Sequence, residues 1–378
     1  MKRRLLSLTL ILALALTACT APAAQSSAQP SADPSAQPSA AAEVDTSKSL
    51  SEHALGLSAD EVVMTVNGAP VTAARYAYWL GYNCNYVQAI YQTYYGRAFD
   101  FSDPAMAEAL RGDAHNVITS FEVSRQLYEE YDITLTPEQE AEVRAALEQY
   151  PEEERAALLK AHGITEADYL EIQSDVFLYD NLIAAAVSQP TDEDIAQYIA
   201  DHNVFGVKHI LLKTVSADVT DEEGNVTQTA EEYNAGRKAL AEELLSRLEQ
   251  ADDMPALFDT LMEEHSEDGR DGEGKLAAPD GYTFSDADSL VGGFREATLA
   301  LEVGQLSGIV ETDYGYHLLL RLPVERSAVE ADCYSALTTA FLTPRMEGAE
   351  VEVLDGVAGL DVAAFFKAFT DYQAAVYQ

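Results

Sequence analysis

The chain has little positive charge for its length. Its 378 residues include 23 lysines and arginines against 64 aspartates and glutamates, which gives a formal net charge of −41 at pH 7. Such an acidic surface repels nucleic-acid phosphates and anionic lipid headgroups, so we expect a soluble protein without a nucleic-acid partner. The hydrophobic content of 47% is ordinary for a chain that buries a core, and the length suits about two domains.

Cysteine is also scarce. The sequence holds three, of which Cys84 and Cys333 lie outside the N-terminal segment. These two could pair in an oxidising compartment, but two cysteines do not make the disulfide framework of small secreted domains. Their spacing in the sequence leaves open whether their Cβ atoms approach closely enough for a bond.

The N-terminus lacks an apolar run long enough to span a membrane. Its run from 5 to 16 falls short of the about 20 residues that a spanning helix needs. Basic residues 2–4 precede it and Leu16-Thr17-Ala18-Cys19 ends it, the order of a signal peptide with a bacterial lipobox. We therefore predict a lipoprotein signal over 1–19 with lipidation at Cys19. An ordinary secretory signal with a chance cysteine is the alternative.

Composition and capping signals divide the rest of the chain. Residues 20–58 are mostly Ala, Ser, Pro and Gln, which predicts a flexible tether. After a strand at Val62–Val66 and an Asn67-Gly68 turn, a series of helices is expected up to residue 203. The expected helix N-caps are Asp103, Thr136, Thr165 and Thr191. An aromatic stripe along 76–95 fits either a buried core or a groove that holds peptides.

Residues 204–323 follow a different pattern, in the order strand, two helices, glycine-rich loop, helix and two strands. This order predicts a compact α+β domain. Two of its segments, 207–212 and 307–320, are predicted to form buried strands, and each contains one histidine, His209 and His317. A histidine in an apolar strand needs polar partners, and two paired strands would supply them to each other. We therefore expect one polar pocket built from both ends of this domain.

These residues resemble a parvulin-type peptidylprolyl isomerase, because five separated motifs occur in the order of that family. The motifs are Val207-x-His209-Ile210-Leu211, Ser266-x-Asp268, Gly274-x-Leu276, Phe294, and Gly304-x-x-Ser307-Gly308-x-Val310-x-Thr312-x-x-Gly315-Tyr316-His317. The flanking helical regions and the domain order resemble PrsA/SurA-like foldases. The implied fold class is α+β, a parvulin-like domain (antiparallel sheet flanked by helices) inserted into a mostly α-helical chaperone domain built from N- and C-terminal segments.

The resemblance implies an organisation for the whole chain. The expected parts are a signal peptide 1–19, a tether 20–58, a helical chaperone part 59–203, an isomerase domain 204–323 and a C-terminal helical part 324–378. It implies a catalytic set and a hydrophobic cup for proline. The catalytic set is His209, Asp268, Thr312 and His317, and the cup is Leu276, Leu290 and Phe294.

The resemblance also implies a non-covalent mechanism with no cofactor. Nothing in the spacing of His209, Asp268 and His317 recommends a metal site. A plainer interpretation of the two histidines is that they only hold the sheet together. The family's Gly-Asp-Leu-Gly motif is changed here to Gly274-Lys275-Leu276-Ala277, and an acidic extension over 280–288 lengthens the following loop.

The implied function is a prolyl isomerase and folding chaperone for exported proteins at the outer face of the cell membrane. Its partners would be unfolded proteins with X–Pro bonds, the membrane through a lipid at Cys19, and a second copy of the chain as a possible homodimer. No cluster of basic residues follows His209, so we expect no preference for phosphopeptides. The alternatives are a catalytically silent holdase and a solute-binding lipoprotein, which should show two α/β lobes.

Overall fold

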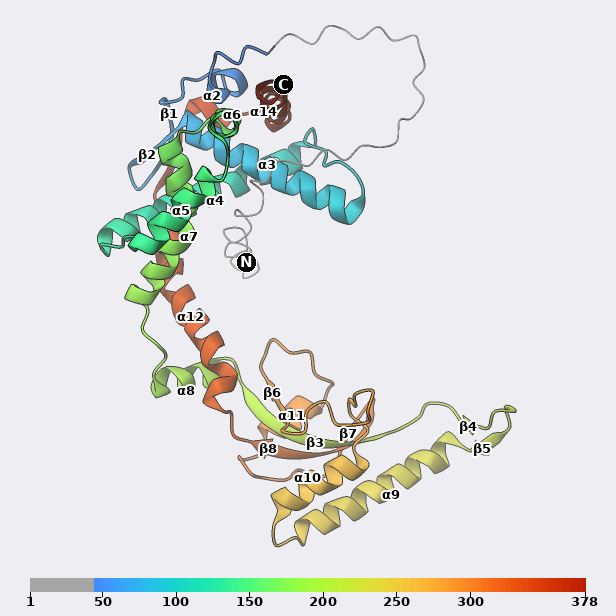
Figure 1. Cartoon of the computed structure of the whole chain (residues 1–378). Helices are drawn as coiled ribbons and strands as arrows, with labels where there is room; N and C mark the ends of the chain where they lie inside the picture. Colours follow the sequence, from blue (N-terminus) through green and yellow to red (C-terminus); the bar gives the residue numbers. More distant parts are fainter. Residues whose placement is uncertain (1–43) are drawn as a thin grey trace. The chain divides into compact units, whose positions relative to one another are not determined.

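A computed structural model describes residues 44–378, which form two compact units (Figure 1). The first unit contains the chain up to Ser188 and again from Thr338, and the second contains Gln189–Leu337. The fold class expected from the sequence is confirmed: an α+β domain interrupts a mostly helical unit that is built from both ends of the chain. The predicted signal peptide and Cys19 lie outside the described residues.

The first unit is mainly helical. Its elements are α2 (Leu50–Ala54), β1 (Val62–Val66), β2 (Ala69–Thr72), α3 (Ala73–Tyr95), α4 (Pro104–Glu130), α5 (Pro137–Glu148), α6 (Glu152–His162), α7 (Glu166–Ala186), β9 (Val351–Val353), α13 (Asp355–Ala358) and α14 (Val362–Val376). The caps Asp103, Thr136 and Thr165 accept hydrogen bonds from the first turns of α4, α5 and α7, as predicted. The helix boundaries in this unit therefore follow from local capping chemistry.

The predicted tether is too long at its C-terminal end. Ser49 caps α2 in a reciprocal capping box with Glu52, and Leu50 is completely buried in the core of the first unit. The composition of the segment is polar, but this capping box and one anchored leucine are enough to order a short helix against an existing core. Residues 50–54 therefore belong to the folded unit, and the part of the tether before residue 44 lies outside the described residues.

The two ends of the chain meet in a small antiparallel sheet of order β2-β1-β9. The turn between β1 and β2 uses Asn67 and Gly68, both with positive φ, as the sequence predicted. On the other side of β1, Met64 pairs with Val353 from the C-terminal segment. This pairing fixes the C-terminal segment to the first unit.

The aromatic stripe on α3 divides between core and surface. Tyr76, Trp79 and their neighbours are buried among residues of α4 and α14, whereas Tyr94 and Tyr95 are 78% and 63% exposed. Gly81 lets α14 approach closely, because a Cβ at this position would overlap the Phe369 ring. The first half of the stripe is thus core, and its second half reaches solvent.

A partly buried ion network ties three helices of the first unit together. Glu122 on α4 is 1% exposed and accepts from Arg75 of α3 at 3.1 Å and from Arg125 at 2.6 Å. Both arginines also bind Glu171 of α7. Charges in such a place are stabilising only when they are paired, and here each carboxylate has two arginine partners.

The second unit contains a sheet between two groups of helices. Its elements are α8 (Asp192–Asp201), β3 (Phe205–Lys213), β4 (Val219–Thr220), β5 (Val226–Gln228), α9 (Ala230–Glu249), α10 (Met254–His265), β6 (Tyr282–Phe284), α11 (Phe294–Leu299), β7 (Val310–Thr312), β8 (Gly315–Leu322) and the first part of α12 (Arg326–Glu347). Helices α9 and α10 cover one face of the sheet and α11 lies on the other (Figure 1). Between β3 and α9, strands β4 and β5 form a small antiparallel hairpin.

The main sheet of this unit has the order β6-β3-β8-β7, and all its neighbours are antiparallel. Strand β6 was not expected from the sequence. It arises inside the glycine-rich loop and pairs Phe205 with Phe284 and Val207 with Tyr282. The loop extension therefore adds an edge to the sheet, so it cannot be treated as a free flap.

Cys84 and Cys333 are both free thiols, each buried in the core of its own unit. Within residues 44–378, every helix is too short or too polar to cross a lipid bilayer.

Candidate functional site

Strand register brings the two predicted histidines together. His209 on β3 pairs with Leu319, and His317 on β8 pairs with Leu211, so the histidines are diagonal neighbours on one face of the sheet. Their Nδ1 atoms are 3.2 Å apart and their rings stack at 5.4 Å with an interplanar angle of 11°. The polar pocket that we expected from the two ends of the domain is thus present.

Two more of the predicted residues complete the group. Asp268 follows the end of α10 and places Oδ2 3.0 Å from Nε2 of His209. Thr312, at the end of β7, places Oγ1 2.8 Å from Nε2 of His317. All four proposed catalytic residues therefore lie in one continuous chain of hydrogen bonds.

The protonation of each group determines which atoms donate and which accept in these hydrogen bonds. The hydrogen bond from His209 holds the pKa of Asp268 well below its usual range, although burial works against it, so the carboxylate is ionised and only accepts. His209 therefore donates from Nε2, and with one proton on each ring its Nδ1 accepts from His317 Nδ1–H. His317 Nε2 in turn accepts from the Thr312 hydroxyl. In this arrangement a single proton lies between the two Nδ1 atoms.

His317 is the more deeply buried of the pair, at 3% exposure. Burial, and secondarily the neighbouring His209, lower the pKa of His317 to about 4, while the charge of Asp268 opposes the shift. A neutral imidazole at this position agrees with the single shared proton.

The lowered pKa of His317 predicts that acid weakens the second unit. An unfolded histidine binds a proton near pH 6.5, whereas folded His317 resists protonation down to about pH 4. Between these values the unfolded state binds more protons, so the contribution of His317 is fully present above pH 6.5 and is lost as the pH falls towards 4. One such group changes the free energy of unfolding by at most about 1.4 kcal/mol per pH unit.

Amide hydrogen exchange of β3 and β8 at stepped pH measures this loss. A His317→Gln variant has no titrating ring and should show a flatter dependence between pH 6.5 and 4. Equal slopes in the two proteins would assign the acid sensitivity to other groups.

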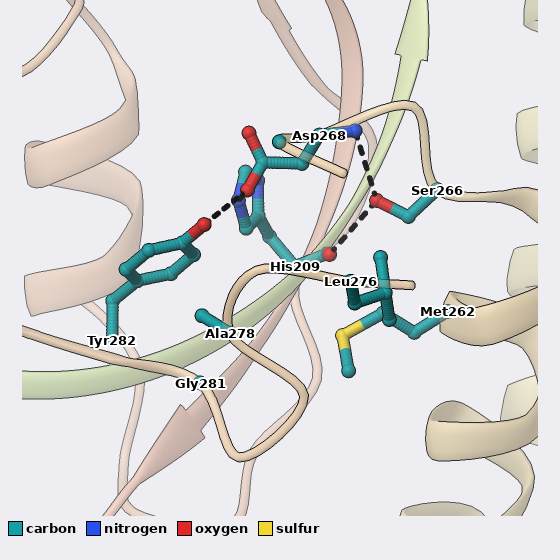
Figure 2. Close-up of a pocket in the computed structure, with 9 residues that line it drawn as sticks. His209, Met262, Ser266, Asp268, Leu276, Ala278, Gly281 and Tyr282 are labelled. Atoms are coloured by element: carbon teal, nitrogen blue, oxygen red, sulfur yellow. Dashed lines mark hydrogen bonds and ion pairs between the residues drawn. The ribbon is translucent and has the colours of Figure 1, made fainter. Parts of the chain in front are cut away.

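An apolar hollow lies beside the polar chain (Figure 2). The lining residues are His209, Met262, Ser266, Asp268, Gly269, Leu276, Ala278, Gly281 and Tyr282. In Figure 2 the side chains of Leu276 and Met262 form the apolar side, and Asp268 and Tyr282 stand opposite them. The hollow thus brings apolar side chains and an ionised carboxylate together.

The predicted proline cup is only partly assembled in this arrangement. Leu276 lines the hollow. Phe294 is 4% exposed, and its ring meets the rings of His209 and His317 edge-on at 5.2 and 5.4 Å. Leu290 is half-buried in the same apolar cluster as Phe294, but it is not among the residues that line the hollow. Phe294 therefore supports the histidines from one side, and Leu290 packs against the apolar cluster to which Phe294 belongs.

The altered loop after Asp268 is held by Arg270. Its guanidinium donates to the carbonyl oxygens of Ser266, Gly274 and Glu263 at 3.0, 2.6 and 2.6 Å. These bonds give the loop a fixed shape even though Lys275 replaces the acidic residue usual in the resembled family. The loop therefore holds Leu276 beside the hollow without that acidic residue.

Two carboxylates of the acidic extension over 280–288 accept hydrogen bonds from neighbouring residues. Asp286 accepts from the Asn203 side chain at 2.9 Å, and Asp288 accepts from the Ser285 amide at 2.7 Å. Asp280 remains exposed. These contacts give Asp286 and Asp288 structural roles within the fold.

Sequence reasoning missed three residues of the site. Tyr282 donates from its hydroxyl to Oδ2 of Asp268 at 2.6 Å, and Met262 supplies part of the apolar wall. Ser266 accepts from the Leu211 amide at 3.1 Å and so ties the end of α10 to β3. The Ser266-x-Asp268 motif was a signal for Ser266, and the aromatic pair around Thr283 was a signal for an edge strand.

Residues 209–322 match the family model described as "Rotamase: PPIC-type PPIASE domain". The geometry and this match define the second unit as a parvulin-type domain. No curated protein matches the chain significantly.

Among solved structures, the chain is similar to PrsA proteins from three bacteria, at 17% identity in each case. Peptidylprolyl isomerase (PrsA) from Bacillus cereus matches over 82% of this chain and 99% of its own, with a TM-score of 0.29. PrsA from Bacillus subtilis matches over 84% and 93%, with a TM-score of 0.23. Foldase protein PrsA from Streptococcus pneumoniae matches over 83% and 93%, with a TM-score of 0.23.

Proposed function

We propose that this protein is a peptidylprolyl cis–trans isomerase and folding chaperone for exported proteins. The observation that carries the proposal is the hydrogen-bonded chain of Thr312, His317, His209 and Asp268 at the wall of an apolar hollow. The match of residues 209–322 to a rotamase family model supports the same reaction.

The proposed chemistry is rotation about the X–Pro amide without covalent change. Amide resonance opposes this rotation with a barrier of about 18–20 kcal/mol, and the uncatalysed step takes tens to hundreds of seconds. A site that binds the twisted amide better than the planar one lowers the barrier without a cofactor. The apolar surface at Leu276 and Met262 would hold the ring, while the fixed charge and dipoles of Asp268 and the histidines act on the adjacent amide.

A protease-coupled assay on a prolyl tetrapeptide tests the proposal, together with the refolding of a protein whose slow phase is proline isomerisation. We expect both reactions to accelerate in proportion to the concentration of the full chain. Rates equal to those in buffer would reject the isomerase.

A silent holdase is the second candidate, and two observations favour it. Lys275 and Ala277 replace residues of the usual loop motif, and Tyr94 and Tyr95 of the first unit are exposed aromatic side chains that suit contact with unfolded chains. A holdase would suppress aggregation of an unfolded client while leaving the tetrapeptide rate unchanged. A solute-binding protein is disfavoured, because residues 44–378 form one helical unit and one antiparallel α+β unit in place of two α/β lobes.

We further infer that the protein acts outside the cytoplasm on a lipid anchor at Cys19. The support is the sequence Leu16-Thr17-Ala18-Cys19 after a basic and an apolar segment. Mass spectrometry of the mature N-terminus should find a lipid-modified cysteine, and a Cys19→Ala variant should leave the membrane fraction. An unmodified N-terminus elsewhere in the chain would reject the anchor.

A further inference from the structure

Tyr282 stands where the glycine-rich loop joins the sheet. It opens β6 and pairs with Val207 of β3. The preceding Gly281 has φ +91°, and a Cβ there would lie 2.7 Å from the Val207 carbonyl oxygen and 2.9 Å from Lys208. Only glycine allows this approach without strain. The backbone therefore fixes the position of Tyr282 beside His209 before the side chain makes any contact.

Packing fixes the direction of the Tyr282 ring. The ring stacks on Phe284 at 5.3 Å with an interplanar angle of 15°, and it meets the His209 ring edge-on at 5.8 Å. This orientation aims the hydroxyl at Oδ2 of Asp268, 2.6 Å away (Figure 2). The same oxygen accepts the Nε2–H of His209 at 3.0 Å. One carboxylate oxygen thus accepts from two donors on the neighbouring strands β3 and β6.

The Tyr282 hydroxyl is a donor throughout the working pH range. Burial first, and then the hydrogen bond and charge of Asp268, raise the pKa of Tyr282 to about 12. The second donor also helps to keep the pKa of Asp268 low, against the effect of burial. Without the hydroxyl, Asp268 would keep only one side-chain donor and could turn away from His209.

We propose that Tyr282 is a positioning residue that acts through Asp268, and through it sets the tautomer and orientation of His209. The inference rests on the proposed isomerase function of this site for its kinetic consequence. Its structural consequence, a fixed carboxylate and a single pair of histidine tautomers, does not depend on catalysis.

A double-mutant cycle tests the kinetic part. Tyr282→Phe keeps the ring and its stacking on Phe284, so only the hydroxyl is lost. We expect kcat/KM to fall about tenfold in the wild-type background, the effect of one charge-assisted hydrogen bond. In the Asp268→Ala background, the same substitution should change kcat/KM by less than about twofold, because its target is gone. Tyr198→Phe, which removes a tyrosine hydroxyl from α8 of the same unit, should leave activity unchanged.

Imidazole ¹⁵N chemical shifts test the structural part without an activity assay. In the wild type we expect His209 to carry its proton on Nε2 and His317 to carry its proton on Nδ1. Tyr282→Phe should shift both rings towards a mixture of tautomers, and Asp268→Ala should do so more strongly. Unchanged shifts in Tyr282→Phe, or an equal kinetic loss in both backgrounds, would overturn the proposal. An inactive wild type would reject the isomerase alone, and the ¹⁵N shifts would then decide the role of Tyr282.

Discussion

Replacing Asp268 by alanine is expected to lower kcat/KM for prolyl isomerisation roughly 100-fold, the usual cost of losing one preorganised polar group in an active site. The reason lies in the position of this carboxylate. It terminates the hydrogen-bond chain, accepts from His209 at 3.0 Å and from Tyr282 at 2.6 Å, and lines the hollow. Its removal takes away the carboxylate among the residues that line the hollow, whose pKa the hydrogen bonds from His209 and Tyr282 hold below its usual range.

The fold should survive this substitution. The Asp268 side chain is 28% exposed, and the loop that carries it is anchored separately through Arg270 and Ser266. We therefore expect unchanged far-UV circular dichroism and unchanged unfolding by urea to within about 1 kcal/mol. A Phe or Leu substitution would confuse packing with charge, so alanine and asparagine are the informative changes.

Two further variants separate charge from shape. Asp268→Asn keeps an oxygen that can accept from Tyr282 but loses the charge, so its activity should lie between that of the wild type and that of Asp268→Ala. Asp280→Ala is the matched control, because it removes an exposed carboxylate from the same loop and leaves the hydrogen bonds among Asp268, His209, His317 and Thr312 in place. Full activity in Asp268→Ala would remove this residue from the site. An equal loss in Asp280→Ala would instead indicate a general effect of charge.

Phe294→Ala is expected to destabilise the second unit by about 3–5 kcal/mol and to abolish most of its activity. The ring is 4% exposed, and it contacts both histidine rings and the ring of Phe284. Truncation would leave a cavity directly beneath the site, so the histidines would lose the surface that orients them. Phe294→Leu fills most of that space and should cost less than about 1.5 kcal/mol.

The unfolding must be followed separately in each unit. Trp79 is the single tryptophan of the chain and is buried in the first unit, so its fluorescence reports that unit alone. Amide hydrogen exchange in β3 and β8 reports the second. The destabilisation caused by Phe294→Ala should appear as faster amide exchange in β3 and β8. The unfolding transition reported by Trp79 fluorescence should not change. Leu290→Ala, half-buried in the same cluster but away from the hollow, should cost less and keep measurable activity.

Much of the fold was predictable because its signals are local. The caps at Thr136, Thr165 and Thr191 each bond within their own first turn, and the Asn67-Gly68 turn needs only two residues with positive φ. The pairing of His209 with His317 was predictable for another reason. A polar ring in an apolar strand has few ways to satisfy its nitrogens, and each strand contained only one such ring.

The missed features depend on contacts between distant segments. Strand β6 forms because Gly281 lets the loop reach β3, some 75 residues earlier in the chain. The aromatic residues on either side of Thr283 favour a strand, but they do not indicate its partner. The place of Tyr282 in the site was therefore missed. The helix at 50–54 was missed because one buried leucine outweighs a polar composition. Leu290 was assigned to the cup by its place in the sequence; it packs against the apolar cluster that contains Phe294 and does not line the hollow.

The most direct test of the account is exchange NMR on a prolyl tetrapeptide, which measures cis–trans interconversion without an auxiliary protease. The account predicts that the full-length wild type accelerates exchange at substoichiometric concentration, and that Asp268→Ala at the same concentration retains about one hundredth of that effect. Exchange at the rate of the free peptide in the presence of the wild type would contradict the claim that this hydrogen-bonded chain and its hollow form a working isomerase site.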